Sequence, residues 1–137
     1  MATLLIVEDQ DMSKDMLAAD VKSWQLFDIV DWASSREEAL AKLREQEYDC
    51  ILVDLSIWDQ NLLPSGERQL GDHTSPYHGI KLLSAILPGY ANKLYLFSAY
   101  IDKVEKELKI LGVMNRILPR PVPSEILKEK LKLILMG

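Results

Sequence analysis

Short runs of apolar residues alternate along this chain with longer stretches in which apolar residues recur at helical spacing. The short runs predict five strands, over residues 3–7, 27–30, 50–53, 93–97 and 114–118. The longer stretches predict five helices, which begin near residues 13, 36, 76, 104 and 124. Strands that alternate with amphipathic helices form a parallel sheet with helices on both faces. The pattern therefore predicts an α/β protein with a doubly wound, five-stranded parallel sheet.

Local signals mark three of the predicted helix ends. Ser35 and Glu38 have the spacing of a capping box, with Ser35 as the N-cap. Ser75 followed by Pro76 is typical of a helix start, because proline is well tolerated at the first helical position. Gly112 follows a helical stretch and is placed to end it as a C-cap.

The segment from about Leu55 to Ser75 shows neither helical nor strand periodicity and is predicted to be irregular. A loop of this length in a compact domain is usually functional or disordered. Its apolar pairs, Ile57-Trp58 and Leu62-Leu63, are compatible with a cover over a site or a surface for a partner. A spacer without a role explains them equally well. Zinc binding by the two histidines of the chain is not expected, because two imidazoles without nearby cysteines are too few ligands.

Composition narrows the class of protein. The 137 residues suggest one domain with a real core, and the net charge of -5 argues against nucleic acid as a direct partner. No apolar run is long enough to cross a bilayer, so we expect no membrane association, and the first residues do not form a secretory signal. Cys50 is the only cysteine, which excludes an intrachain disulfide and fits a cytoplasmic protein.

Polar residues follow four of the five predicted strands. In doubly wound sheets, ligands bind beyond the carboxyl ends of the strands, where the strand order switches. With the strand order 2-1-3-4-5, this edge would gather three acids, a hydroxyl and a guanidinium, those of Glu8, Asp9, Asp54, Ser98 and Arg120. Each residue alone is ordinary for a solvated loop. Together, clustered carboxylates favour Mg²⁺, and a hydroxyl with a cation suits a phosphoryl group.

This pattern resembles the receiver domain of bacterial two-component response regulators. The matching features are Glu8-Asp9, Asp54 in "ILVDLS", Ser98-Ala99 in "LYLFSA" and Arg120-Pro121, in the same order and on the same strands. The resemblance covers nearly the whole chain apart from residues 57–76. It implies a flavodoxin-like fold with strand order 2-1-3-4-5.

The resemblance also implies a role for each residue. Asp54 would accept a phosphoryl group from a phosphohistidine on a sensor histidine kinase or a histidine phosphotransfer protein. Mg²⁺ would be held by Glu8, Asp9, Asp54 and the backbone carbonyl of Ser56. Ser98 would donate a hydrogen bond to a phosphoryl oxygen, and Arg120 occupies the position of the family's lysine.

Three features depart from the family. Arg120 keeps the charge of the usual lysine but is larger and planar. Ile117 stands where many receivers have a switching aromatic residue. The connection after Asp54 is expanded, over about residues 55–76, before His78-Gly79 takes the place of the usual Asp-Gly.

We therefore expect a single receiver domain over residues 1–137, without an output domain. It would signal by binding a downstream protein, through the surface formed by the helix near 104–111, the fifth strand and the last helix. We expect a phosphoacceptor with self-catalysed phosphotransfer and dephosphorylation, and no enzyme of another kind.

Two alternatives stay open. One is a degenerate receiver that binds partners without phosphorylation. The other is a small hydrolase with Asp54 as nucleophile, although Ser56 stands where that chemistry needs a second acid.

Overall fold

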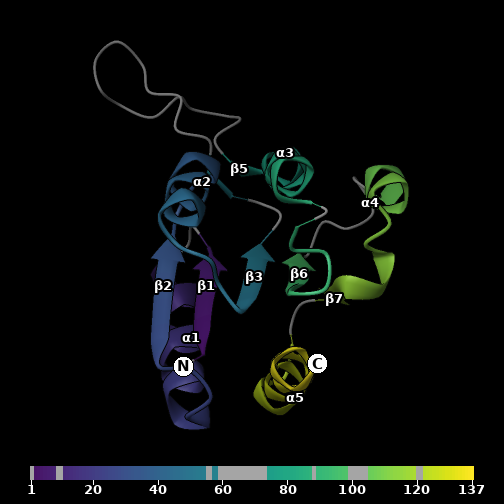
Figure 1. Ribbon diagram of the computed structural model, residues 1–137. Helices are drawn as coiled ribbons and strands as arrows, with labels where there is room; N and C mark the ends of the chain where they lie inside the picture. The colour runs from purple at the N-terminus through teal and green to yellow at the C-terminus, as the bar shows by residue number, and fades with distance from the viewer. Residues whose placement is uncertain are drawn as a thin grey trace, which may run out of the picture.

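A computed structural model describes residues 2–8, 11–54, 57–58, 74–87, 89–98, 105–119 and 122–137. Its main sheet has five strands in the order β2-β1-β3-β6-β7, and all neighbouring strands are parallel (Figure 1). The strands are β1 Thr3–Val7, β2 Ile29–Ala33, β3 Cys50–Asp54, β6 Leu94–Ser98 and β7 Ile117–Pro119. Since β6 and β7 are the fourth and fifth predicted strands, the predicted order 2-1-3-4-5 is confirmed.

Five α-helices cover the two faces of the sheet, as predicted. They are α1 Asp11–Trp24, α2 Arg36–Glu45, α3 Pro76–Ile86, α4 Glu105–Leu111 and α5 Ser124–Met136. Figure 1 shows α1 and α5 on one face, with α2, α3 and α4 on the other. Each face has its own apolar core, one between the sheet and α1 with α5, the other between the sheet and the remaining three helices.

The central strand β3 shows why its sequence is continuously apolar. Ile51 and Val53 contribute to the core beneath α2, α3 and α4, whereas Cys50 and Leu52 contribute to the core beneath α1 and α5. All four are fully buried. A strand with helices on both sides needs apolar residues at odd and even positions alike. Full burial of each large side chain stabilises the fold by about 1.5–3 kcal/mol.

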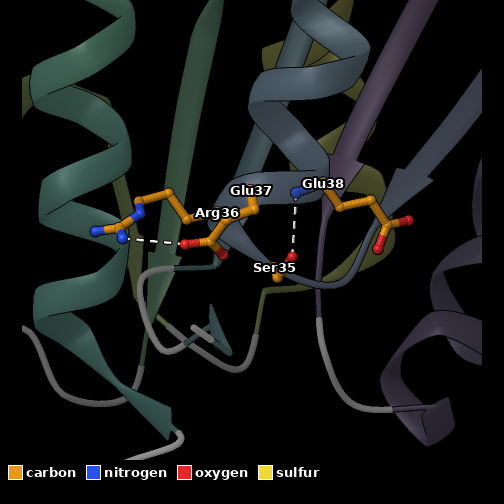
Figure 2. Close-up of polar contacts among 4 residues, drawn as sticks. All are labelled: Ser35, Arg36, Glu37 and Glu38. Atoms are coloured by element: carbon orange, nitrogen blue, oxygen red, sulfur yellow. Dashed lines mark hydrogen bonds and ion pairs between the residues drawn. The ribbon is translucent and has the colours of Figure 1, made fainter. Parts of the chain in front are cut away.

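The start of α2 confirms the predicted capping box (Figure 2). The Ser35 hydroxyl accepts a hydrogen bond from the Glu38 N–H at 3.1 Å. The Glu38 carboxylate in return accepts from the N–H of Ser34, one residue before the N-cap, at 3.2 Å. Two backbone N–H groups at the helix start are thereby satisfied, which is worth about 1 kcal/mol for a cap of this kind.

Two helices end in a residue of left-handed backbone conformation. Gly112, after α4, has φ 75°, which confirms its predicted place as a helix end. Gln25, after α1, has φ 56°, although it is not a glycine. Glycine adopts this conformation without a steric penalty, whereas a side chain with a Cβ is strained there.

The prediction of a strand over residues 114–118 was partly wrong. Met114–Arg116 form a 3-10 helix, η2, and the strand begins only at Ile117. The Arg116 N–H donates to the Val113 carbonyl at 2.9 Å, which closes a turn. Pairing with β6 starts where Ile117 lies beside Leu96. An apolar run alone does not distinguish a tight helical turn from the start of a strand.

The prediction of an irregular segment from Leu55 to Ser75 also needs correction. Ile57–Trp58 form β4 and Thr74–Ser75 form β5, and the two pair in an antiparallel ribbon. Helix α3 begins directly after the ribbon at Pro76, as predicted. Strands of two residues are too short to show a periodic pattern. Residues 59–73, which include Leu62, Leu63 and His73, lie outside the described residues.

Among the helices that the structure describes, none has the length and apolar character required to cross a membrane.

Candidate functional site

Two acidic residues lie at the carboxyl ends of the adjacent strands β1 and β3. Val7 is paired with Val53 in the parallel register, so Glu8 and Asp54 follow at neighbouring positions. The exposed fraction is 0% for Glu8 and 4% for Asp54. Burial of a carboxylate is costly, so two buried acids side by side indicate a site and not a solvated loop.

The sheet itself fixes both residues. The Glu8 N–H donates to the Ala33 carbonyl at 2.9 Å, which extends the pairing of β1 with β2 by one residue. Asp54 is still part of β3 and is paired with Phe97 of β6. Both acids also have interaction partners beyond this pairing. Because Glu8 is held to β2 and Asp54 to β6, the backbone position of each acid is fixed by a neighbouring strand.

Ser98 reaches the same edge of the sheet. It is the last residue of β6, one position beyond the partner of Asp54, and it is paired with Pro119 of β7. The backbone register therefore brings the ends of four strands together, from β2 to β6 through β1 and β3. Arg120 follows Pro119 directly, but it lies outside the described residues, as do Asp9 and Ser56.

Two of the predicted magnesium ligands, Glu8 and Asp54, lie among the described residues. Glu8 and Asp54 supply carboxylate oxygens, the donors that Mg²⁺ prefers over the imidazole and thiolate groups that hold zinc. Within the described residues, no three His, Cys, Asp or Glu side chains gather as a group that could hold a metal ion. The third predicted carboxylate, that of Asp9, is not among them. The donor chemistry that is described fits Mg²⁺.

The sequence-based search missed a cation near this edge. Arg36 opens α2, which follows the carboxyl end of β2, and its guanidinium contacts the Glu37 carboxylate at 3.0 Å (Figure 2). Figure 2 shows the Arg36 side chain extending toward α3. Its side chain is only 24% exposed. The prediction rested on residues that directly follow strands. Arg36 is three residues after β2 and follows the N-cap Ser35, so it was not among them.

No family model matches the chain. The transcriptional regulatory protein CitB from Klebsiella pneumoniae is 28% identical over 133 residues, which cover 95% of this chain and 49% of CitB. The chain thus spans about half the length of this relative.

Solved structures are more informative. A CheY-like response regulator receiver domain from Methanospirillum hungatei superposes with a TM-score of 0.75 over 99% of this chain and 94% of its own, at 19% identity. A signal receiver domain of a Pseudomonas fluorescens protein gives 0.74 over 98% and 94%, at 20% identity. This chain has the receiver-domain fold. The resemblance inferred from the strand ends is thereby confirmed at the level of the fold.

A third neighbour of the same receiver fold bears on the metal. It is the receiver domain of a sensor histidine kinase from Pseudomonas aeruginosa, whose structure has a magnesium ion coordinated in its active site cleft. It superposes with a TM-score of 0.70 at 19% identity, over 99% of this chain and 98% of its own.

Proposed function

We propose that this receiver domain accepts a phosphoryl group on Asp54 from a sensor histidine kinase or a histidine phosphotransfer protein. The observation that carries the proposal is the pair of buried acids, Glu8 and Asp54, at the carboxyl ends of adjacent strands in a receiver fold. Polar residues buried at this edge of a doubly wound sheet are typical of a ligand site.

In the proposed reaction, a carboxylate oxygen of Asp54 attacks the phosphorus of a phosphohistidine. An O–P bond forms as the P–N bond breaks, and the electron pair of the broken bond remains on the imidazole, which takes up a proton. The product is an acyl phosphate on Asp54. Little covalent chemistry is required of the protein, so position and charge decide the rate.

Glu8, Asp9, Asp54 and the carbonyl of Ser56 are the residues that would hold Mg²⁺, which offsets negative charge on the phosphoryl group when it is bound. Ser98 would donate a hydrogen bond to a phosphoryl oxygen. Arg120 would supply a fixed positive charge, although its planar group differs from the usual lysine. The burial of Asp54 limits the access of water to the acyl phosphate, which slows its hydrolysis.

We propose that the output is binding to a protein. Large apolar side chains are exposed on α4, η2 and α5, namely those of Ile110, Met114, Ile126, Leu133 and Met136. Exposed apolar surface often marks a protein interface, and Met16 of α1 is also exposed. The net charge of -5 does not suit direct contact with nucleic acid. The transcriptional role in the name of CitB belongs to a protein of which this chain covers 49%.

One sequence feature favours a second function, a binding module that does not depend on phosphorylation. Ile117 replaces the aromatic residue of many receivers and is half-buried in β7, so this position has no ring to change rotamer. This alternative predicts partner binding that is the same in the wild type and in Asp54→Ala.

The test is incubation with Mg²⁺ and acetyl phosphate, followed by intact mass. We expect a mass gain of one phosphoryl group in the wild type and in Asp49→Asn, which changes an exposed acid at the other end of the sheet. We expect no gain in Asp54→Asn. The proposal is contradicted if the folded wild-type protein gains no mass with acetyl phosphate and does not bind beryllofluoride in an NMR titration. The second function, binding without phosphorylation, would then be favoured.

A further inference from the structure

Strand β2 lies at one end of the main sheet, and among the strands that the structure describes it pairs with β1 alone (Figure 1). The Ala33 carbonyl of β2 accepts a hydrogen bond from the Glu8 N–H, so the backbone of Ala33 faces β1. Backbone groups of successive strand residues point in opposite directions. The N–H and C=O groups of Val30 and Trp32 therefore face away from the sheet, along its open edge.

A groove runs beside this edge, between the last turns of α1 and β2. Its volume is about 530 Å³. Apolar side chains of Val21, Phe27, Val30 and Trp32 line it, and Lys22 is at the rim. Phe27, Val30 and Trp32 are only half-buried, although they are large and apolar. The volume is within the range of ligand pockets, and the groove is open to solvent along one side.

Val30 and Trp32 thus have two properties at once. Their side chains line the groove, and their backbone groups are open to hydrogen bonding. An extended segment that pairs with these groups would place its own alternate side chains on the face where the groove lies. The other edge of the sheet differs, because β7 has only three residues and ends in Pro119, which lacks an N–H.

Lys22 and Asp28 both line the groove, one charge of each sign, and Lys22 is the one that a carboxylate of an occupant can neutralise. Asp28 already accepts a hydrogen bond from the Ala2 N–H at 2.9 Å. Lys22 is exposed and forms no ion pair with any residue that the structure describes. A negative side chain on the occupant would therefore find a cation at the rim.

A second copy of this chain fits the edge less well. If two β2 strands paired antiparallel so that Val30 of each lay opposite Trp32 of the other, Asp31 would lie directly opposite its own symmetry mate. Like charges at directly opposed positions destabilise a strand pair. This register of a self-pair is therefore disfavoured, whereas a different polypeptide without an acid opposite Asp31 avoids the repulsion.

We propose that the outer edge of β2, with the groove beside it, binds an extended segment of a partner protein. The segment adds as a strand to β2, places alternate apolar side chains against Phe27, Val30 and Trp32, and brings a carboxylate to Lys22. The β2 edge is at the opposite end of the main sheet from β7, and binding there does not depend on phosphorylation of Asp54.

The test uses a capped eight-residue peptide of alternating Val and Thr with one terminal Glu, titrated into the labelled protein and followed by NMR. We expect saturable binding, with amide exchange at Val30 and Trp32 slowed at least about ten-fold at saturation. The same peptide with Lys in place of Glu should bind about five-fold more weakly at low salt. A peptide N-methylated at every residue should not bind, since neither of its edges has donors for the ladder.

Two protein variants test whether the charge of Lys22 selects the peptide. Lys22→Glu should reverse the preference between the Glu and Lys peptides, whereas Lys132→Glu, on the exposed surface of α5, should not. The proposal is overturned by a Glu peptide that does not bind, or that binds without slowing exchange at Val30 and Trp32. Equal binding of the Glu and Lys peptides overturns the acidic occupant. If amide exchange at Val30 and Trp32 becomes slower as the protein concentration rises, without peptide, the edge binds a second copy of this chain instead.

Discussion

Acidic side chains lie at both ends of the main sheet, in opposite environments. At the amino end, Asp49 accepts hydrogen bonds from the N–H of Thr3 at 2.9 Å and from its hydroxyl at 3.3 Å. Asp28 accepts from the N–H of Ala2. Both acids are exposed. At the carboxyl end, Glu8 and Asp54 are buried at the ends of adjacent strands.

The comparison of the two ends shows that an acidic residue next to a strand can be either structural or functional. The acids of the amino end satisfy backbone donors where β1 begins, much as an N-cap does for a helix. They remain in water, so their charge costs little. The acids of the carboxyl end give up most of their hydration, which only an interaction with a partner or a ligand offsets. Burial, and not residue type, separates the structural acid from the functional one.

The largest expected effect is that of Asp54→Asn. Asparagine has nearly the same shape but cannot form an acyl phosphate, so the gain of one phosphoryl group with acetyl phosphate and Mg²⁺ should be lost completely. The free energy of unfolding in urea should stay the same or rise, because a buried charge is removed. An Asp54→Asn protein that still gains a phosphoryl group would place the acceptor elsewhere. Large destabilisation would assign Asp54 a structural role like that of Asp49.

Asp49→Ala should show the reverse pattern. It leaves the N–H of Thr3 without its acceptor at 2.9 Å, so we expect a loss of about 1–2 kcal/mol in the free energy of unfolding. Phosphorylation should be unchanged. Asp15→Ala, at an exposed position of α1, is the matched control and should change stability by less than about 0.5 kcal/mol. If Asp49→Ala instead impaired phosphorylation at full stability, the contrast between the two ends would fail.

Ser35→Ala tests whether a buried polar residue at the carboxyl end can be purely structural. The hydroxyl caps α2 through the Glu38 N–H at 3.1 Å, so its loss should lower the free energy of unfolding by about 1 kcal/mol. Phosphorylation of Asp54 should be retained. Glu38→Gln keeps an acceptor for the Ser34 N–H and should cost much less. A loss of phosphorylation in a folded Ser35→Ala protein would extend the functional site to the start of α2.

The sequence predicted the elements whose pattern is long enough to be periodic. The buried run of β3 and the caps at Ser35 and Gly112 follow from local chemistry that tertiary contacts reinforce. The strand order was predicted from the resemblance to receiver domains, since local pattern alone does not fix which strands are neighbours. The β4–β5 ribbon was missed because two residues per strand carry no period. The turn of η2 was missed because apolar Met114 and Ile117 fit a strand as well as a tight helix.

The site was predictable only in part for a related reason. Parallel topology alone places Glu8, Asp54 and Ser98 at one edge, so their backbone positions followed once the strands were assigned. Burial of Glu8 and Asp54 did not follow, since it depends on what covers the edge. Arg36 was missed because its place near the site comes from the fold of the β2–α2 connection and not from a strand end.

The smallest expected effect concerns Tyr48, which contacts an acid in the middle of a strand rather than at either end of the sheet. Asp31, in the middle of β2, accepts a hydrogen bond from the Tyr48 hydroxyl at 2.6 Å. Burial, and then the hydrogen bond to Asp31, raises the pKa of Tyr48 from 10.0 to about 12. The folded state therefore keeps this proton when the unfolded chain begins to lose it. The contribution of Tyr48 to stability is complete below pH 10 and is lost as the pH rises from 10 to 12.

Tyr48→Phe isolates this contribution, because phenylalanine does not titrate. Between pH 7 and pH 10, the wild type should lose about 0.4 kcal/mol more of its free energy of unfolding than Tyr48→Phe, as half of the unfolded chains release the tyrosine proton at pH 10. Burial also raises the pKa of Cys50 to about 12, but this affects both proteins equally and cancels in the difference. Equal losses in urea titrations at the two pH values would mean that Tyr48 ionises in the folded state as it does in water. The Asp31 carboxylate would then resemble the solvated acids of the amino end.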